Sequence, residues 1–347
     1  MILKQENIYM ARCLELGKKG AGLVSPNPMV GCVIVYNNKI IGEGYHQKYG
    51  ENHAEVNAIN MVKNKNELLG ATLYVNLEPC SHFGKTPPCC ELIVKVGISS
   101  VVIGSKDISK KVNGLGIKFL KENNIIIKVG LLKKECLALN KRFFTYHKKN
   151  RPYIILKWAE TKDGFMDFIR DGSKKGINWI STENSKTLVH QWRAEEDAIL
   201  VGRTTVENDN PKLTVREVKG RNPVRVILDS NLKLGSQHHI FDKSTKTIIA
   251  NLTLDKKNNN IVYLKCTEKD MIYSLLNYLH KIEITSLIVE GGLKTLTSFI
   301  NNNYWDEARV IIGNKIFKNG LKSPLINRKW TYKDTIDQDI LLKYFND

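Results

Sequence analysis

The sequence has 347 residues, 42% of them hydrophobic and 25% charged, which is typical of a soluble globular protein of about two domains. No run of eighteen apolar residues occurs and the N-terminus lacks a continuous apolar core, so we expect no membrane association, no signal peptide and a cytoplasmic location. The net charge of +18 raises the question of nucleic-acid binding. The charge divides evenly, with 20 basic against 11 acidic groups in residues 1–147 and 33 against 24 in residues 148–347. We therefore attribute it first to compositional drift, then to phosphate-bearing ligands, and last to nucleic acid.

The first half alternates helical and strand patterns. The periodicity predicts helices over 4–20, 53–65, 89–96, 116–122 and 134–146, and strands over 30–36, 39–44, 72–77, 100–104 and 125–129. Asn37-Asn38 is typical of a hairpin turn. Strands separated by helices predict a layered α/β domain.

A polar, basic segment that ends in proline, His147–Pro152, predicts a domain boundary, which we place between residues 147 and 148. Beyond it a second α/β series is expected. Its strands are predicted over 153–157, 198–202, 224–229, 247–250, 287–290 and 308–312, and its helices over 184–193, 269–280 and 293–301. The two halves share no motif, so we expect two different domains fused in one chain.

The first half contains a set of metal-ligand residues. His53 is followed by Glu55, and further along by Pro79-Cys80 and Cys89. One imidazole and two thiolates form a three-ligand zinc set that leaves the fourth position to water, whose pKa zinc lowers to about 7. Glu55 is too close in sequence to His53 to be a second ligand on the same helix face, but it can move the proton of that water. This arrangement is the signature of zinc deaminases.

The alternative readings are a closed structural zinc site and unrelated core cysteines, and a closed site needs a fourth protein ligand. Cys90 and His82 are candidates by proximity. Cys90 is a poor one because adjacent residues on a helix point about 100° apart. A non-ligating glutamate favours the catalytic reading.

The surrounding motifs carry a resemblance to a known family. Eight residues separate the cysteines, whereas nucleic-acid and cytidine deaminases usually have two, and the segments Ser25–Val33, Gly42–His46 and Gly50–Asn52 lie upstream. The pattern closely resembles the deaminase half of the bifunctional riboflavin-biosynthesis deaminase-reductases. The resemblance implies zinc bound by His53, Cys80 and Cys89, proton transfer by Glu55, and substrate contacts from Asn27, His82 and Lys85.

The second half has no G-x-G-x-x-G motif, and we interpret the partial matches at 42–44 and 114–116, both in the first half, as turns. Its motif blocks instead resemble the reductase half of the same family, which has a dihydrofolate-reductase-like fold and uses NADPH. These blocks are Lys157–Gly164, Trp179–Ser181, Trp192–Ala194, Ala198–Gly202, Thr205–Arg216, Arg225–Ser230 and Val289–Gly292.

The resemblance implies a fold, a substrate and two further sets of residues. The fold is a cytidine-deaminase-like three-layer domain (1–147) fused to a dihydrofolate-reductase-like α/β domain (148–347). The substrate is 2,5-diamino-6-ribosylamino-4(3H)-pyrimidinone 5′-phosphate, which is deaminated, after which its ribosyl group is reduced to ribityl. The substrate contacts of the second domain are Lys157, Arg193, Leu213, Arg216 and Glu290. The NADPH contacts are Ala159, Trp179, Thr205, Asp209, Ser230, Gly292, Leu293, Lys294, Thr295, Leu296, Thr297 and Ser298.

The sequence departs from the family pattern in three places, the first of which is Thr161-Lys162 in place of a common Ser-Leu. Fourteen residues, 165–178, stand where the family has only a short connection, and residues 107–110 replace a turn that usually contains proline.

An RNA deaminase and a non-catalytic binding protein are the alternative functions. The cysteine spacing and the absence of an RNA-binding motif argue against the first, and intact Glu55 argues against the second. We expect no nucleic-acid partner and a homo-oligomer.

Overall fold

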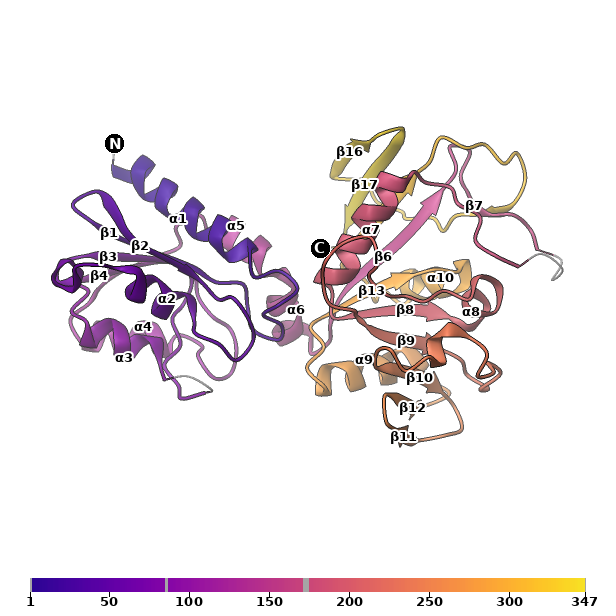
Figure 1. The fold of residues 1–347 in the computed structure, drawn as a ribbon, viewed down its shortest axis with the longest axis horizontal. Helices are drawn as coiled ribbons and strands as arrows, with labels where there is room; N and C mark the ends of the chain where they lie inside the picture. Colours follow the sequence, from indigo (N-terminus) through magenta and orange to yellow (C-terminus); the bar gives the residue numbers. More distant parts are fainter. Residues whose placement is uncertain (1, 85–86, 171–174, 347) are drawn as a thin grey trace. The chain divides into compact units, whose positions relative to one another are not determined.

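The computed structural model describes residues 2–84, 87–170 and 175–346. The chain forms two compact units, Met1–Lys149 and Asn150–Asp347 (Figure 1). Within the described residues, every helix is too short or too polar to cross a membrane.

The first unit is a five-stranded sheet with helices on both faces (Figure 1). In spatial order its strands are β2 (Lys39–Tyr45), β1 (Gly31–Tyr36), β3 (Thr72–Leu77), β4 (Ser100–Ser105) and β5 (Ile126–Val129). Its helices are α1 (Ile2–Lys18), α2 (Ala54–Met61), the 3₁₀ turn η1 (Lys65–Leu68), α3 (Cys89–Lys95), α4 (Leu115–Glu122), α5 (Lys133–Leu139) and α6 (Lys141–Lys149).

The alternation of side chains along β1 divides this core into two layers. Cys32 and Ile34 pack under α2, α3 and α4, whereas Val33 and Val35 pack under α1 and α5. Both faces of the strand are therefore buried, and the expected three-layer α/β arrangement is confirmed.

Two expectations for the first unit are wrong. The helix predicted over 134–146 is two helices, and the break lies at Asn140, which ends α5. The Asn140 side chain binds the backbone of Met29 there, accepting from its N–H at 2.8 Å and donating to its carbonyl at 2.9 Å. Gly42 and Gly44 lie in β2 and not in a turn. A Cβ at either position would meet the backbone of Ala58, so these glycines allow α2 to lie directly on the strand.

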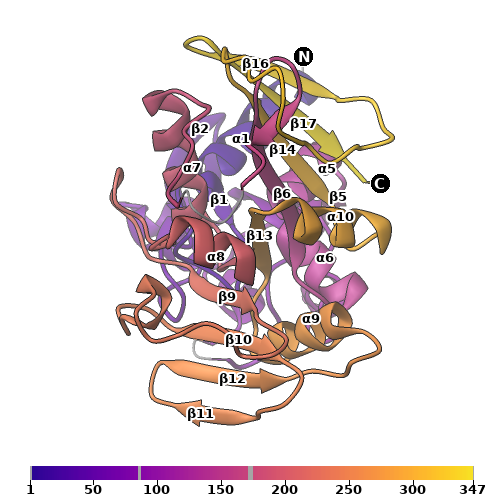
Figure 2. The same cartoon turned by 90° about the vertical axis from the view of Figure 1, so that its right-hand side faces the viewer.

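The second unit is built on a ten-stranded sheet (Figure 2). In spatial order its strands are β11 (Lys256–Asn258), β12 (Ile261–Lys265), β10 (Thr247–Asn251), β9 (Val224–Leu228), β8 (Ala198–Gly202), β13 (Ser286–Glu290), β6 (Tyr153–Glu160), β14 (Glu307–Ile312), β17 (Asp339–Phe345) and β16 (Tyr332–Ile336). The strands from β12 to β14 run parallel, and the outer strands are antiparallel. A separate pair joins β7 (Phe165–Asp167) to β15 (Leu321–Lys322).

Helices cover both faces of this sheet. On one face lie α9 (Met271–Lys281) and α10 (Leu293–Asn301), and on the other lie α7 (Glu183–Glu195), α8 (Arg203–Asp209) and the 3₁₀ turn η2 (His239–Phe241) (Figure 2). We had not predicted α8 or the strands β7, β11, β12, β15, β16 and β17. Most residues of β11 and β16 are exposed and polar, so their strand conformation comes from pairing with a neighbour and not from an apolar pattern of their own.

Candidate active sites

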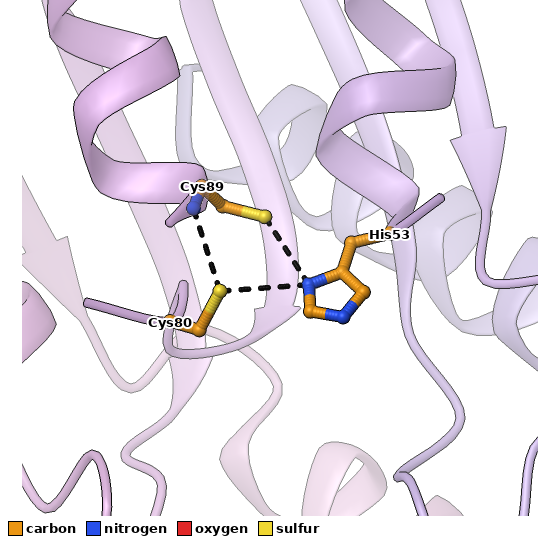
Figure 3. A group of neighbouring side chains, drawn as sticks. All are labelled: His53, Cys80 and Cys89. Carbon is orange, nitrogen blue, oxygen red and sulfur yellow. Dashed lines mark hydrogen bonds between the residues drawn. The ribbon is translucent and has the colours of Figure 1, made fainter. Parts of the chain in front are cut away.

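The predicted zinc ligands come together in the first unit (Figure 3). His53 precedes α2, Cys89 begins α3, and Cys80 lies in the loop after β3. His53 Nδ1 is 3.3 Å from the Cys89 sulfur and 3.5 Å from the Cys80 sulfur (Figure 3). A nitrogen and a sulfur that share a tetrahedral zinc are about 3.6 Å apart, so the donor set fits a zinc ion bound through Nδ1.

Among the described residues, this metal cluster contains three ligands and no fourth. The Cys90 thiol points elsewhere, toward the carbonyls of Pro79 and Gly116. His82 is not in the cluster either. The set therefore keeps the open position that a catalytic zinc needs and that a structural zinc lacks.

The two thiols of the cluster titrate as a pair. Hydrogen bonds from Cys89 and His53 lower the pKa of Cys80 to about 4, whereas the same hydrogen bond and burial raise the pKa of Cys89. A divalent cation between them would supply the charge that makes both thiolates.

Glu55 lies in the first turn of α2 with 3% of its surface exposed. Burial raises the pKa of its carboxyl, and the charge of His53 opposes that rise. The carboxyl is within hydrogen-bonding reach of the Cys89 side chain, but it is outside the ligand set. A buried carboxyl beside a metal site, with a pKa raised toward neutrality, can both accept and return a proton.

Glu78 holds the loop that carries Cys80, and its role had not been expected. Its buried carboxylate accepts backbone hydrogen bonds from Asp107 (3.1 Å), Gly114 (3.2 Å) and Ile117 (3.2 Å). These bonds tie the end of β3 to the start of α4. The available signal in the sequence was an acidic residue at the end of an apolar strand, directly before Pro79-Cys80.

The predicted substrate contacts of this unit have different positions. Asn27 Nδ2 is 3.1 Å from Nε2 of His46, whose ring centroid is 5.3 Å from that of His53, so His46 connects Asn27 to the ligand set. Among the described residues, no hydrogen-bond partner faces the buried Nδ1 of His82. The charge of buried Asp107 is close enough to His82 to interact with it. Lys85 lies outside the described residues.

The second unit contains a pocket of about 310 Å³. It brings together several residues of both predicted sets and adds others. Its lining includes the expected Lys157, Trp179, Arg193, Asp209, Leu213 and Arg216, together with Ile177, Ser181, Lys186, Val189, His190, Asn210, Pro211, Lys212 and His239.

Glu290 organises one wall of this pocket. It is paired in register with Lys157 on the neighbouring strand, with 4.0 Å between Lys157 Nζ and Glu290 Oε2. Arg193 donates to both carboxylate oxygens, at 3.0 and 2.6 Å. Burial raises the pKa of Glu290, but Arg193 and Lys157 together outweigh burial and lower it to about 2. The bidentate partner of Arg193 in this structure is thus the carboxylate of Glu290.

Positive charge remains on this wall. Burial lowers the pKa of His190 to about 4, and its Nδ1 accepts the backbone N–H of Arg216 at 3.1 Å, so this histidine is neutral. The guanidinium of Arg216 lies over Thr214, bonding its carbonyl and its hydroxyl at 3.1 and 2.9 Å. One carboxylate therefore faces three cations, Lys157, Arg193 and Arg216, which suits a phosphate-bearing ligand.

Other predicted cofactor contacts gather at the carboxyl ends of β8, β9 and β13, which are neighbours in the sheet. The hydroxyl of Thr205 accepts the N–H of Gly292 at 3.1 Å, and Gly292 caps α10, whose first turn contains no acidic residue. A Cβ on Gly202 would lie 2.6 Å from the Thr295 hydroxyl. Hydroxyls and a helix N-terminus at the carboxyl edge of a parallel sheet fit the phosphates of a dinucleotide.

Three members of the predicted cofactor set, Leu296, Ala159 and Ser230, lie outside the lining of the pocket. The side chain of Leu296 is completely buried in the apolar core, so it packs there and presents no surface to a ligand. Ala159 lies on β6, and the hydroxyl of Ser230, just beyond β9, contacts Met271. None of the three lines the 310 Å³ pocket.

Known proteins resemble both units. The cytidine and deoxycytidylate deaminase zinc-binding region matches residues 3–105, and the RibD C-terminal domain matches residues 152–325. The riboflavin biosynthesis protein RibD of Aquifex aeolicus is 40% identical over 92% of this chain and 90% of its own length, and that of Escherichia coli K12 is 35% identical over 90% and 88%.

Solved structures resemble the chain over its whole length. One is a diaminohydroxyphosphoribosylaminopyrimidine deaminase/5-amino-6-(5-phosphoribosylamino)uracil reductase from Thermotoga maritima, with a TM-score of 0.89, 36% identity and 99% of each chain covered. Another is RibD of Acinetobacter baumannii, with a TM-score of 0.89, 29% identity and 99% coverage of each chain.

Proposed function

The chain belongs to the RibD family of riboflavin-biosynthesis deaminase/reductases, and we propose that residues 1–147 carry its zinc-dependent deamination and residues 148–347 its NADPH-dependent reduction. The expected family, fold class and bifunctional activity are thereby confirmed. The division of residues between the two reactions and the use of NADPH are our proposals. The substrate is 2,5-diamino-6-ribosylamino-4(3H)-pyrimidinone 5′-phosphate, and the final product is 5-amino-6-ribitylaminouracil 5′-phosphate.

In the deaminase unit, His53, Cys80 and Cys89 hold zinc, which when bound supplies a Lewis acid that makes water nucleophilic at neutral pH. Glu55 accepts a proton from the attacking water and returns protons to the pyrimidine ring and the departing amino group. A carbon–oxygen bond forms, a carbon–nitrogen bond breaks, and ammonia leaves. The observation that carries this assignment is the three-ligand cluster with a buried, non-ligating carboxyl beside it.

Substrate contacts in the same unit come from Asn27, His82 and Lys85. The amide of Asn27 has both a donor and an acceptor for a pyrimidine edge. The buried, unpartnered Nδ1 of His82 gives this residue a free position for a ligand, within the described part of the chain. Lys85 supplies positive charge for the phosphate.

In the reductase unit, the cationic wall holds the phosphorylated substrate through Lys157, Arg193, Leu213, Arg216 and Glu290. NADPH supplies the hydride when bound. Its contacts are Ala159, Trp179, Thr205, Asp209, Ser230 and the segment Gly292–Ser298. Lys157 is the polar group placed next to the reacting C1′ of the ribosyl chain, and Glu290 keeps that lysine oriented.

One experiment separates the two halves of the proposal. Purified zinc-loaded protein is given the pyrimidine ribosyl phosphate, with and without NADPH. We expect ammonia release without NADPH, and NADPH consumption that follows formation of the deaminated intermediate. The absence of either signal would refute that half. We further propose that the protein is cytoplasmic and forms a homo-oligomer. Sedimentation analysis of the purified protein tests the oligomeric state.

A further inference from the structure

The segment 165–178, which is longer than the family pattern, reaches the rim of the 310 Å³ pocket. Phe165–Asp167 pairs with β15, and the ring of Phe168 stacks on Phe317 with centroids 3.9 Å apart. The Gly176 N–H donates to the carbonyl of Asn208 at 2.8 Å. Ile177 lines the pocket itself. Residues 171–174 lie outside the described part of the chain.

Arg170 links this segment to a pocket residue. Its Nε donates to Asp167 at 2.7 Å, and its Nη2 donates to Asp209 at 3.2 Å. Only 12% of the side chain is exposed, so solvent screens these ion pairs less than it would at the surface. Asp209 is on the pocket lining, at the end of α8.

The charge of Asp209 depends on this neighbour. Burial raises the pKa of its carboxyl to about 6, Arg170 opposes the rise and Asp167 adds to it. A buried carboxylate that lost its cation would take up a proton near neutral pH. The other titratable groups that line the pocket are Lys157 from β6, Lys186, His190 and Arg193 from α7, Lys212 and Arg216 from the segment after α8, and His239 from η2.

We propose that Arg170 is a positioning residue that holds the Asp209 carboxylate as an anion on the pocket wall, where Asp209 accepts hydrogen bonds from the hydroxyl groups of a bound sugar. The other charged groups on the lining are cations, which attract a phosphate but cannot accept a hydrogen bond from a hydroxyl. An ionised carboxylate accepts at both oxygens, and acidic residues bind ribose hydroxyls in this way. The inference rests on the proposed reductase function of this unit.

Arg170→Ala should weaken sugar binding in a pH-dependent way. An opposite charge at this distance lowers a carboxyl pKa by about 1–3 units, so its removal should weaken binding at pH 7 by between about two-fold and about ninety-fold. The affinity should recover as the pH is raised toward 9, because Asp209 ionises again. Arg170→Lys should retain most of the affinity, and Asp209→Asn should be weak at every pH.

The sugar could belong to the dinucleotide or to the pyrimidine ribosyl phosphate, and two measurements on the full-length protein distinguish them. Calorimetric titration with NADP⁺ alone gives the dissociation constant of the cofactor, and steady-state kinetics give the KM of the substrate, each between pH 5.5 and 9. A change confined to the first assigns Asp209 to the cofactor ribose, in agreement with the proposed NADPH contacts, and a change confined to the second assigns it to the substrate ribosyl group in place of those contacts. Either result supports the inference.

Phe168→Leu is the matched control, because it removes the stack on Phe317 and leaves both carboxylates and Arg170 in place. An Arg170→Ala protein with unchanged constants would overturn the inference, as would an equal loss at every pH or an identical loss in Phe168→Leu. If the wild-type chain itself neither binds NADP⁺ nor consumes NADPH, the proposed reductase function fails instead. A melting temperature for each variant excludes unfolding as the cause.

Discussion

Glu55→Gln isolates the proton-transfer step, because glutamine keeps the shape of the side chain and removes its ability to carry a proton. Glu55 is 3% exposed and lies outside the three-ligand cluster, so zinc binding should persist. General acid–base catalysis contributes about 10²–10⁴ in rate. In the proposed mechanism the same carboxyl serves both the attack of water and the departure of ammonia, so we expect a loss near the upper end, about 10⁴-fold or about 5 kcal/mol in activation free energy.

Ammonia release, zinc content and thermal unfolding should be measured on the same preparation. Burial raises the pKa of Glu55 above 4.5, so ionisation of this carboxyl disfavours folding of the metal-free chain above that pH. In an aliquot of that preparation from which zinc has been removed, a neutral glutamine removes this cost, and the melting temperature at pH 7 should be unchanged or higher than that of the zinc-free wild type. Glu91→Gln, on the exposed side of α3, is the matched control and should retain activity.

Two outcomes would refute this reasoning. Loss of zinc from Glu55→Gln would mean that Glu55 is a ligand and that the cluster has been misassigned. Ammonia release within about ten-fold of wild type would mean that another group moves the proton.

Three other perturbations test the remaining parts of both sites. Cys89→Ser should reduce zinc content and abolish ammonia release, while reduction of the already deaminated intermediate continues; joint loss of both activities would contradict the division into two units. The folded pKa of Glu290, about 2, lies below the ordinary 4.5, so its ionisation stabilises the fold above about pH 4.5 and this stability is lost as the pH falls toward 2. Glu290→Gln should therefore lower the free energy of unfolding at pH 7 by about 3 kcal/mol, because it leaves Arg193 without its buried partner; a change below about 1 kcal/mol in denaturant titration would be inconsistent with the pairing. Gly44→Ala should displace α2 from β2 at Ala58 and weaken zinc binding measured by competition with a chelator, and unaltered zinc affinity would show that the helix start does not depend on this contact.

The sequence alone determined the zinc site, because its signal is local and chemical. The residue types that bind zinc are few, and the spacing of His53, Glu55, Cys80 and Cys89 is the basis on which we assign three ligands and propose one proton carrier. The layered α/β class was equally accessible. Strands buried on both faces consist of nearly continuous apolar runs, and β1 and β4 each show one, whereas buried Asn76 interrupts the run in β3.

Only the tertiary structure decided which polar groups meet. Arg193 and Glu290 are 97 positions apart, and Arg170 and Asp209 are 39 apart, so no local pattern could show that these pairs form. The break between α5 and α6 depends on a contact of Asn140 with a loop 111 positions away. Edge strands such as β16 likewise take their conformation from a neighbour. Local sequence specifies residue chemistry and periodicity, whereas long-range packing specifies the partners, and the partners set the charge of each buried group.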